Sequence, residues 1–315
     1  MVLGIAVVNY RTAESVRRLV PTLVTFTGRG TLLLTVVDNS SELEEIEAIV
    51  QDGRRSISAQ GGELDVSVIA SVENLGFARG NNVAAQSLLE RGADYLWFLN
   101  PDIEILNGQL EDVLASIEAA TSPLLTTKTV EGSAEWSGLQ TVSLLSSQTR
   151  KAAESGVARG SEWRKLLIPA GHSLIVRSVL WVQLDGFSPD HFLYYEEADL
   201  AFRARKLGVR PQSIQAVTVL HAGAASTNET VSAQVDRSRV VASKLTYEEA
   251  SRSALIFFRN NLPLRAPLVT VMRLGYALFV GRRFGASRGQ AIARGILRGW
   301  KTTLQARQGK DPEHV

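Results

Sequence analysis

Three carboxylates lie within four residues of the chain: Glu196, Glu197 and Asp199. They precede a helix-like segment in which Leu200, Ala204 and Leu207 follow the spacing of one packed face. At a helix N-terminus, unpaired backbone N–H groups and the helix dipole favour negative charge. Repulsion within the cluster raises the pKa of at least one carboxyl, which suits general acid–base catalysis. An acidic helix start without a chemical role has the same pattern, so the run alone does not separate the two interpretations.

A second group of polar residues follows an apolar run, Tyr95–Leu99, that is typical of a buried strand. The run ends at Asn100, Pro101 and Asp102. In α/β sheets, ligands bind at the carboxyl ends of strands. An amide and a carboxylate two residues apart are suited to magnesium or manganese that is shared with substrate phosphates. Taken alone, Asn-Pro-Asp is also a common turn sequence.

The same arrangement of strand and polar end occurs three more times in the first 82 residues. Strand patterns at 4–8, 32–37 and 66–70 are followed by polar segments at 9–11, 38–41 and 73–82. Helical stripes alternate with them at about 16–24, 43–50 and 110–117. This alternation predicts an α/β fold with a mostly parallel, Rossmann-like sheet flanked by helices. The polar strand ends predict a nucleotide pocket.

The order of eight motifs resembles that of the family-two inverting glycosyltransferases with a glycosyltransferase-A fold, especially their bacterial rhamnosyltransferase-like branch. The motifs are Val8-Asn9-Tyr10, Val37–Ser41, Asn74–Ala78 with Gly80–Asn82, Asn100–Asp102, Gly171–Arg177, Gly186-Phe187, Tyr195–Arg203 and His221. Each motif is weak when taken singly, but their shared order is specific. The resemblance covers roughly residues 1–230.

The resemblance implies a site for a nucleoside-diphosphate sugar and a divalent cation. The residues expected to bind the nucleotide sugar are Asn9, Tyr10, Arg11, Asp38, Asn74, Gly76, Phe77, Arg79, Asn81, Asn100 and Gly171. In such enzymes the position of Asp38 hydrogen-bonds the pyrimidine base. Asn100 stands where many relatives carry the first acid of a D-x-D motif. Asp102 matches the acid that binds the metal, and His221 matches a histidine that completes the metal shell in some relatives.

Some of these residues also have ordinary explanations. Arg11 and Arg79 are suited to phosphate contacts, but exposed arginines are usually only solvated. Gly76 either allows close approach of the backbone to a nucleotide or serves an ordinary turn. The alternative for His221 is a solvent-facing side chain at the end of a strand, but its place in the order of motifs favours the functional interpretation.

One position departs from the pattern of the family. Relatives usually carry Glu-Asp-x-Asp, in which the first Asp is the catalytic base, whereas this chain has Glu197 there. Glutamate is one methylene longer, so the backbone must shift to keep the reacting atoms in range. We expect Glu197 to act as the base, with Asp199 as the alternative. The substitution also supports a second interpretation, a catalytically inactive scaffold that binds a sugar nucleotide at the membrane.

The resemblance implies a metal-dependent transferase that moves a sugar to a hydroxyl of a cell-wall or surface-polysaccharide acceptor. The expected donor is a dTDP- or UDP-sugar, with rhamnose the leading candidate. The acceptor is expected to be a carbohydrate or a lipid-linked saccharide. A nucleotidyltransferase is a competing class, but it usually has a glycine-rich basic loop after its first strand. The segment Asn9–Thr12 is not such a loop.

Composition predicts one large domain and a basic extension. The chain has 315 residues, 45% of them hydrophobic, which is enough for a full core. We expect a catalytic domain at 1–236, with a nucleotide-binding part at about 1–125 and an acceptor-side part at about 126–236. The absence of cysteine excludes disulfides and thiolate metal sites. Together with a first segment that lacks the pattern of a leader peptide, it predicts a cytoplasmic location.

The expected extension, 237–315, holds 15 Lys and Arg against 4 Asp and Glu. A helical stripe runs from Tyr247 to Phe258, and an apolar run at 267–280 is interrupted by Arg273. Arg282 and Arg283 follow, so the run is expected to be too short to span a bilayer. A basic amphipathic region of this kind predicts binding to an anionic membrane surface at the inner face of the cell membrane. A solvated helical bundle packed on the catalytic core is the alternative. No motif supports nucleic-acid binding, and the oligomeric state is not indicated.

Overall fold

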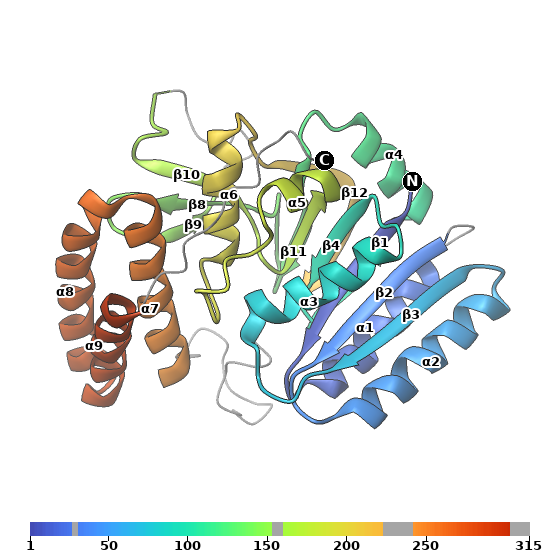
Figure 1. The fold of residues 1–315 in the computed structure, drawn as a ribbon, viewed down its shortest axis with the longest axis horizontal. Helices are drawn as coiled ribbons and strands as arrows, with labels where there is room; N and C mark the ends of the chain where they lie inside the picture. The colour runs from blue at the N-terminus through green and yellow to red at the C-terminus, as the bar shows by residue number, and fades with distance from the viewer. Residues whose placement is uncertain (27–30, 153–159, 223–241, 303–315) are drawn as a thin grey trace.

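The computed structural model describes residues 1–26, 31–152, 160–222 and 242–302 (Figure 1). Its main sheet has nine strands in the order β3-β2-β1-β4-β11-β6-β12-β5, with β7 paired to β6. These strands are β1 (Leu3–Asn9), β2 (Thr31–Asp38), β3 (Glu63–Ala70), β4 (Tyr95–Leu99), β5 (Ile103–Asn107), β6 (Leu124–Glu131), β7 (Ala134–Trp136), β11 (Ser173–Arg177) and β12 (Gln212–His221). A second, three-stranded sheet comprises β8 (Leu139–Ser143), β9 (Thr149–Lys151) and β10 (Lys165–Pro169).

The strands β3, β2, β1 and β4 are parallel neighbours. The chain therefore moves outward from β1 to β3 and then returns to place β4 on the other side of β1. Such a reversal leaves a crevice at the carboxyl ends of the two central strands, where α/β proteins bind ligands. The strand β11 lies antiparallel between β4 and β6, so the sheet is mixed, and the predicted α/β class is confirmed.

Helices cover both faces of the main sheet. They are α1 (Ala13–Phe26), α2 (Leu43–Ala59), α3 (Gly76–Glu90), α4 (Leu110–Ala119), α5 (Ser178–Gln183) and α6 (Glu196–Lys206). The helices α1, α2 and α4 pack over one face around Ile5 and Trp97. The helices α3, α5 and α6 pack over the opposite face around Phe98 and Phe187. Helices therefore pack against the central strands from both faces of the sheet.

One prediction of burial near the acidic run is wrong. Leu200 and Ala204 are fully buried as expected, but Leu207 is 48% exposed. The helix α6 ends at Lys206, and the chain then turns through Gly208, which has a φ of +78°. Leu207 therefore lies beyond the helical face that the spacing extended through it.

The C-terminal helices pack on the rest of the protein as a separate helical layer (Figure 1). They are α7 (Lys244–Asn261), α8 (Ala266–Phe284) and α9 (Ala286–Lys301), with a short 3-10 turn, η2 (Pro263–Arg265), before α8. Phe257 and Phe258 of α7 are fully buried and belong to the same core cluster as α6. The expected boundary at residue 236 lies outside the described residues.

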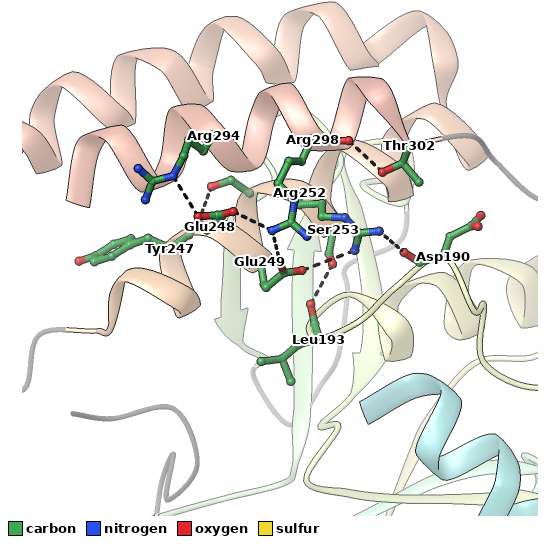
Figure 2. Close-up of polar contacts among 11 residues, drawn as sticks. Asp190, Leu193, Tyr247, Glu248, Glu249, Arg252, Ser253, Arg294, Arg298 and Thr302 are labelled. Atoms are coloured by element: carbon green, nitrogen blue, oxygen red, sulfur yellow. Dashed lines mark hydrogen bonds and ion pairs between the residues drawn. The ribbon is translucent and has the colours of Figure 1, made fainter. Parts of the chain in front are cut away.

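Ion pairs join α7 to α9, as Figure 2 shows. Glu249 is 3% exposed and accepts from Arg298 at 2.8 Å. Glu248 pairs with Arg294 and Arg298 at 3.2 and 2.7 Å. On its other side α7 holds the segment before the acidic run, because Ser253 donates to the carbonyl of Leu193 at 2.8 Å. The basic character of this part of the sequence is thus partly neutralised within the fold.

The apolar run at 267–280 was expected to be too short to span a bilayer, but the helical stretch that contains it is longer than the run. The helical stretch Pro263–Phe284 has 22 residues and contains an 18-residue segment with a mean hydropathy of 1.3, so it is long and apolar enough to cross a membrane by length and composition alone. It begins before the apolar run and continues through Arg282. One side of α8 packs on α9 through Val269, Ala277 and Val280. The opposite side, which we call the α8 apolar face, is exposed and consists of Leu268, Val271, Leu274, Leu278 and Phe279.

Candidate active site

Two adjoining cavities lie at the carboxyl ends of the central strands. The first, of about 230 Å³, is lined by residues that follow β1 and β4, including Tyr10 and Asp102. The second, of about 710 Å³, contains Glu196 and Glu197 and reaches the helices α7 and α8. The residues that line both cavities are Phe77, Asn100, Leu193, Tyr194 and His221. A ligand in the first cavity would therefore meet a ligand in the second across this shared wall.

The start of α3 forms one side of the first cavity and requires glycine at residue 76. Gly76 has a φ of +73°, and a Cβ there would lie 2.4 Å from the carbonyl oxygen of Phe192. Asn74 accepts from the Gly76 N–H at 2.9 Å, and the Phe77 N–H donates to Phe192 at 2.8 Å. These contacts hold the predicted residues Asn74, Gly76 and Phe77 against the segment that leads to the acidic run.

Asn9 and Asp38 organise the strand ends from behind. The Asp38 carboxylate accepts from the Asn9 amide at 2.9 Å, from the Ser40 N–H at 3.0 Å and from the Glu42 N–H at 2.7 Å. The side-chain oxygen Oδ1 of Asn9 accepts from the backbone N–H and from the hydroxyl of Thr12. Neither residue lines the first cavity, whereas Thr12 and Asn39, which sequence reasoning did not single out, do line it.

Three further predicted residues also lie away from the cavity lining. Arg11 is exposed and stacks on the Tyr10 ring at 5.3 Å. Arg79 is exposed and pairs with Glu73 at 3.3 Å. Asn81 is fully buried within α3, where its amide donates to the carbonyl of Phe77 at 3.0 Å. Of these, only Asn81 is sequestered from solvent.

Asp102 and His221 face each other at the first cavity. The Nε2 of His221 lies 3.7 Å from Oδ2 of Asp102, because β12 brings residue 221 beside Ile103 of β5. Among the described residues, neither His221 Nε2 nor the buried Oδ1 of Asn100 has a hydrogen-bond partner. Two orphaned polar atoms beside a carboxylate are the arrangement that a divalent cation satisfies. The three residues that were predicted to hold the cation therefore fit it.

Glu131, at the end of β6, orients His221 from the other side. Its Oε1 lies 3.1 Å from His221 Nδ1, and Lys151 pairs with its second oxygen at 2.8 Å. The hydrogen bond with His221, followed by the Lys151 charge, lowers the pKa of Glu131 to about 2 against the effect of burial. A carboxylate on one ring nitrogen leaves the other free to bind a metal. Sequence reasoning missed Glu131 because it lies in a stretch without clear periodicity.

His172 lies beneath His221, with the two rings stacked at 4.2 Å between centroids. Its Nε2 lies 3.0 Å from the hydroxyl of Thr129, and burial, followed by the nearby His221, lowers its pKa to about 3. Donor atoms of Glu131, His172 and His221 lie within 4.8 Å of one another. These three side chains form a group that could hold a metal ion, and His172 is its buried member.

Glu196 and Glu197 begin α6 and face the second cavity. Burial raises the pKa of Glu197 to about 7, although hydrogen bonds from two backbone N–H groups lower it. Burial, and then the Glu197 carboxylate, raise the pKa of Glu196 well above its usual value. Gly171 packs beside the base, since a Cβ there would lie 3.6 Å from the carboxyl carbon of Glu197. A carboxyl with a pKa near 7 is matched to proton transfer at neutral pH.

The two residues before these acids are held in a strained backbone conformation. Tyr194 and Tyr195 have φ of +70° and +68°, in the left-handed region that non-glycine residues rarely occupy. The Tyr195 hydroxyl donates to the carbonyl of Ser147, in the loop between β8 and β9. The second sheet therefore sets the direction in which α6 starts.

Asp199 has a different place from the two glutamates. It is 1% exposed, and its Oδ2 accepts from Arg203 at 2.9 Å. Its Oδ1 accepts from Asn261 of α7 at 2.9 Å. Asp199 lines neither cavity. Asp199 therefore joins α6 to α7, whereas Glu196 and Glu197 line the second cavity.

Comparison with known proteins identifies the fold that carries this site. No family model matches the chain. The low-salt glycan biosynthesis hexosyltransferase Agl10 of Haloferax volcanii is 24% identical over 236 residues, which cover 70% of this chain and 66% of that protein. The chain thus spans slightly less than two thirds of this relative's length.

Two solved structures are similar over nearly the whole chain. S. aureus TarS 1-349 in complex with UDP-GlcNAc gives a TM-score of 0.53 at 16% identity. The matched region covers 95% of this chain and 81% of the TarS chain. GalNAc-T7 with UDP, GalNAc and Mn2+ gives a TM-score of 0.59 at 9% identity. Here the matched region covers 96% of this chain and 56% of the GalNAc-T7 chain. At these identities the likeness defines the architecture and leaves the reaction open. The chain has the glycosyltransferase-A fold.

Proposed function

We propose that the protein is an inverting glycosyltransferase that moves a sugar from a nucleoside diphosphate to an acceptor hydroxyl. The observation that carries the proposal is the pair of adjoining cavities. One lies at the carboxyl ends of β1 and β4, and the other contains a carboxyl with a pKa raised to about 7. The similarity to a glycan hexosyltransferase and to two structures bound to UDP or UDP-GlcNAc supports the same class.

In this proposal the donor occupies the first cavity. Tyr10, Asn74 and the backbone at Gly76 contact the nucleotide, and Asn100 lies where the sugar and diphosphate meet the second cavity. Asp102, His221 and Asn100 would hold magnesium or manganese. When bound, such a cation neutralises the diphosphate charge and makes it a better leaving group. Glu131 keeps the Nε2 of His221 directed at this position.

The acceptor occupies the second cavity, with its hydroxyl beside Glu197. Glu197 accepts the hydroxyl proton while the acceptor oxygen attacks the anomeric carbon in line. The bond between that carbon and the diphosphate oxygen breaks in the same step, so one displacement inverts the stereochemistry. Glu196 lies beside it in the same cavity, and burial, followed by the Glu197 carboxylate, raises the pKa of the Glu196 carboxyl.

A donor screen tests the class and identifies the nucleotide. We expect thermal stabilisation by one of UDP-, dTDP- and GDP-sugars in the presence of manganese, and loss of that stabilisation in Asp102→Ala. UDP is the nucleotide in both similar structures, whereas dTDP-rhamnose is the donor implied by the sequence resemblance. Ligand at a hundredfold excess over Kd stabilises the fold by about 2.7 kcal/mol.

The inactive scaffold is the competing function, and product release distinguishes it. A transferase releases nucleoside diphosphate only when donor, cation and acceptor are all present. A scaffold would bind the donor and release nothing, whatever saccharide acceptor is added. Chromatographic measurement of nucleoside diphosphate with a panel of carbohydrate and lipid-linked acceptors therefore decides between them.

We also propose that the enzyme works at the inner face of the cell membrane, on a cell-wall or surface-polysaccharide acceptor. The α8 apolar face is between 45% and 67% exposed at each of its five residues. Arg282 and Arg283 lie at its end and are exposed. Apolar side chains flanked by arginines bind anionic bilayers. The double variant Val271→Glu, Leu278→Glu should lose co-sedimentation with phosphatidylglycerol vesicles and keep donor binding. Equal pelleting of variant and parent would contradict this location.

A further inference from the structure

A cationic side chain lines the second cavity together with its acids. Arg273 of α8 lines this cavity together with Met272 and Tyr276. It does not line the first cavity, where the donor is proposed to lie. Its position therefore relates it to the acceptor and not to the diphosphate of the donor.

Three hydroxyl groups fix the Arg273 guanidinium. Its Nε donates to Ser147 Oγ at 3.0 Å, its Nη1 to Ser251 Oγ at 3.2 Å and its Nη2 to the Tyr195 hydroxyl at 3.2 Å. Each of these hydroxyls donates its own proton to a backbone carbonyl. They therefore present only lone pairs to Arg273, and the guanidinium is held in one orientation.

These contacts do not balance the charge of Arg273. Among the described residues, no carboxylate oxygen lies within 4.0 Å of it, whereas Arg252 and Arg298 on the neighbouring helices both pair with Glu249. A guanidinium has five N–H donors. Three are used here, which leaves one N–H on each terminal nitrogen. An oriented guanidinium with two free donors matches two oxygens of a phosphate group.

We propose that Arg273 binds a phosphate or diphosphate group of the acceptor. The acceptor would then be a saccharide joined through phosphate to a lipid, with its hydroxyl at Glu197 and its phosphate at Arg273. Met272 and Tyr276, which are 43% and 45% exposed, continue the cavity wall toward the α8 apolar face. The lipid chain leaves along this wall. This inference rests on the proposed transferase function, because it names the acceptor of that reaction.

A direct binding measurement tests the proposal without catalysis. Farnesyl diphosphate, inorganic diphosphate and farnesol are titrated into the full chain by calorimetry, in EDTA, so that no cation at Asp102 supplies a diphosphate site. We expect farnesyl diphosphate to bind the parent and Arg54→Gln equally. Arg54 is the control because it is an exposed arginine of α2 that lies outside both cavities and outside the α8 apolar face. Arg273→Gln should bind about tenfold or more weakly, as loss of a charged hydrogen-bonded pair implies.

The three ligands separate the sources of binding. Dependence on Arg273 for inorganic diphosphate as well as farnesyl diphosphate would show that free phosphate suffices. Dependence for farnesyl diphosphate alone would show that the apolar wall is also needed. Farnesol should bind the parent and Arg273→Gln alike. Undiminished binding of farnesyl diphosphate to Arg273→Gln would overturn the proposal.

Arg273 also joins α8 to Tyr195, so its replacement tests structure as well as binding. Thermal unfolding shows whether Arg273→Gln is folded, and Arg273→Lys keeps the charge while losing the two-pronged contact. If both variants unfold, the arginine Nε–H signals of the parent protein, assigned by triple-resonance spectra, give the answer. A shift of the Arg273 signal on adding farnesyl diphosphate supports the proposal, and an unchanged signal rejects it. Failure of the donor screen would reject the transferase function. The binding measurement at Arg273 would still be valid, because it needs neither donor nor catalysis.

Discussion

At the scale of single residues, the site separates its carboxylates by environment. Asp102 faces a histidine at the first cavity, Glu131 lies behind that histidine, and Asp199 is held by Arg203 and Asn261. Among the described residues that line these two cavities, Glu196 and Glu197 are the carboxyls whose pKa values are raised. A raised pKa suits this pair to proton transfer at neutral pH, and the longer side chain at residue 197 does not prevent its carboxyl from reaching the cavity.

The first prediction concerns the pH dependence of catalysis. A base must be unprotonated, and the pKa of Glu197 is about 7. The logarithm of kcat/KM should therefore rise with pH, with unit slope below about 7, and level off above it. Glu197→Gln should lower kcat by about 10²–10⁴ and leave donor-induced thermal stabilisation unchanged. Parental turnover in this variant would assign the base elsewhere.

The second prediction concerns stability. A carboxyl whose pKa is raised by folding contributes stability below its unfolded pKa, and that stability is lost as pH rises through the folded pKa. Glu196→Gln should therefore become progressively more stable relative to the parent as the pH rises from 5 to 8.5. Urea denaturation at several pH values measures this. A difference that stays constant with pH would contradict the raised pKa of Glu196.

At the scale of elements, sequence patterns identified the first four strands and the helices α1, α2 and α4, but not α3 or the second half of the sheet. The strand β4 has the bounds that its apolar run predicts, because it is buried on both faces. The strand β6 was missed because its buried positions include Thr126, Thr127 and Thr129. Their hydroxyls bond to Ser173 and His172 inside the fold. A polar residue with a buried partner cannot be distinguished from a loop residue until the partner is known.

The same reasoning explains which site residues were found. Asn74, Gly76, Asn100, Asp102 and His221 are close to strand ends, and the motif order indicated them. Glu131 comes from a stretch without clear periodicity. Arg273 and the lining residues of α7 come from segments whose helical and apolar patterns were interpreted as packing or membrane binding and not as part of the site. Asp38 was expected to face a nucleotide base, yet its hydrogen bonds are used to shape the loop that follows β2. Only tertiary contacts determine such a role.

A third prediction belongs to the start of α3. Gly76→Ala places a Cβ 2.4 Å from the Phe192 carbonyl at a φ of +73°. It should cost about 1–3 kcal/mol and weaken donor binding, because the segment before the acidic run must move. Gly92→Ala is the matched control, since Gly92 has a φ of +82° with no atom within 4 Å. Differential scanning calorimetry and donor titration measure both effects, and equal behaviour of the two variants would contradict the role of the close contact.

At the scale of the whole molecule, the C-terminal helices complete the catalytic unit. The helix α7 bonds to the segment before the acidic run through Ser253, and to Asp199 through Asn261. The buried Glu249 connects α7 to α9 through Arg298 (Figure 2). The layer that carries the α8 apolar face therefore also determines the position of Glu197.

A fourth prediction tests this connection. Glu249→Ala leaves Arg252, which is 14% exposed, without its carboxylate and should cost about 3–5 kcal/mol. Glu248→Ala, at a residue that is 17% exposed, should cost about 0–1 kcal/mol because its arginine partners are half exposed. Urea denaturation of both variants gives the comparison. Similar losses from the two substitutions would show that burial of Glu249 does not determine its contribution.

The packing of Phe257 and Phe258 into the core of α6 has a practical consequence for dissecting this protein. A catalytic fragment that stops before α7 would leave a large apolar surface in water, and we expect it to aggregate. Likewise, the helices expressed by themselves would lack most of their packing partners. Separate assignment of chemistry and membrane attachment must therefore come from point substitutions in the intact chain, since the two halves do not form independent folding units.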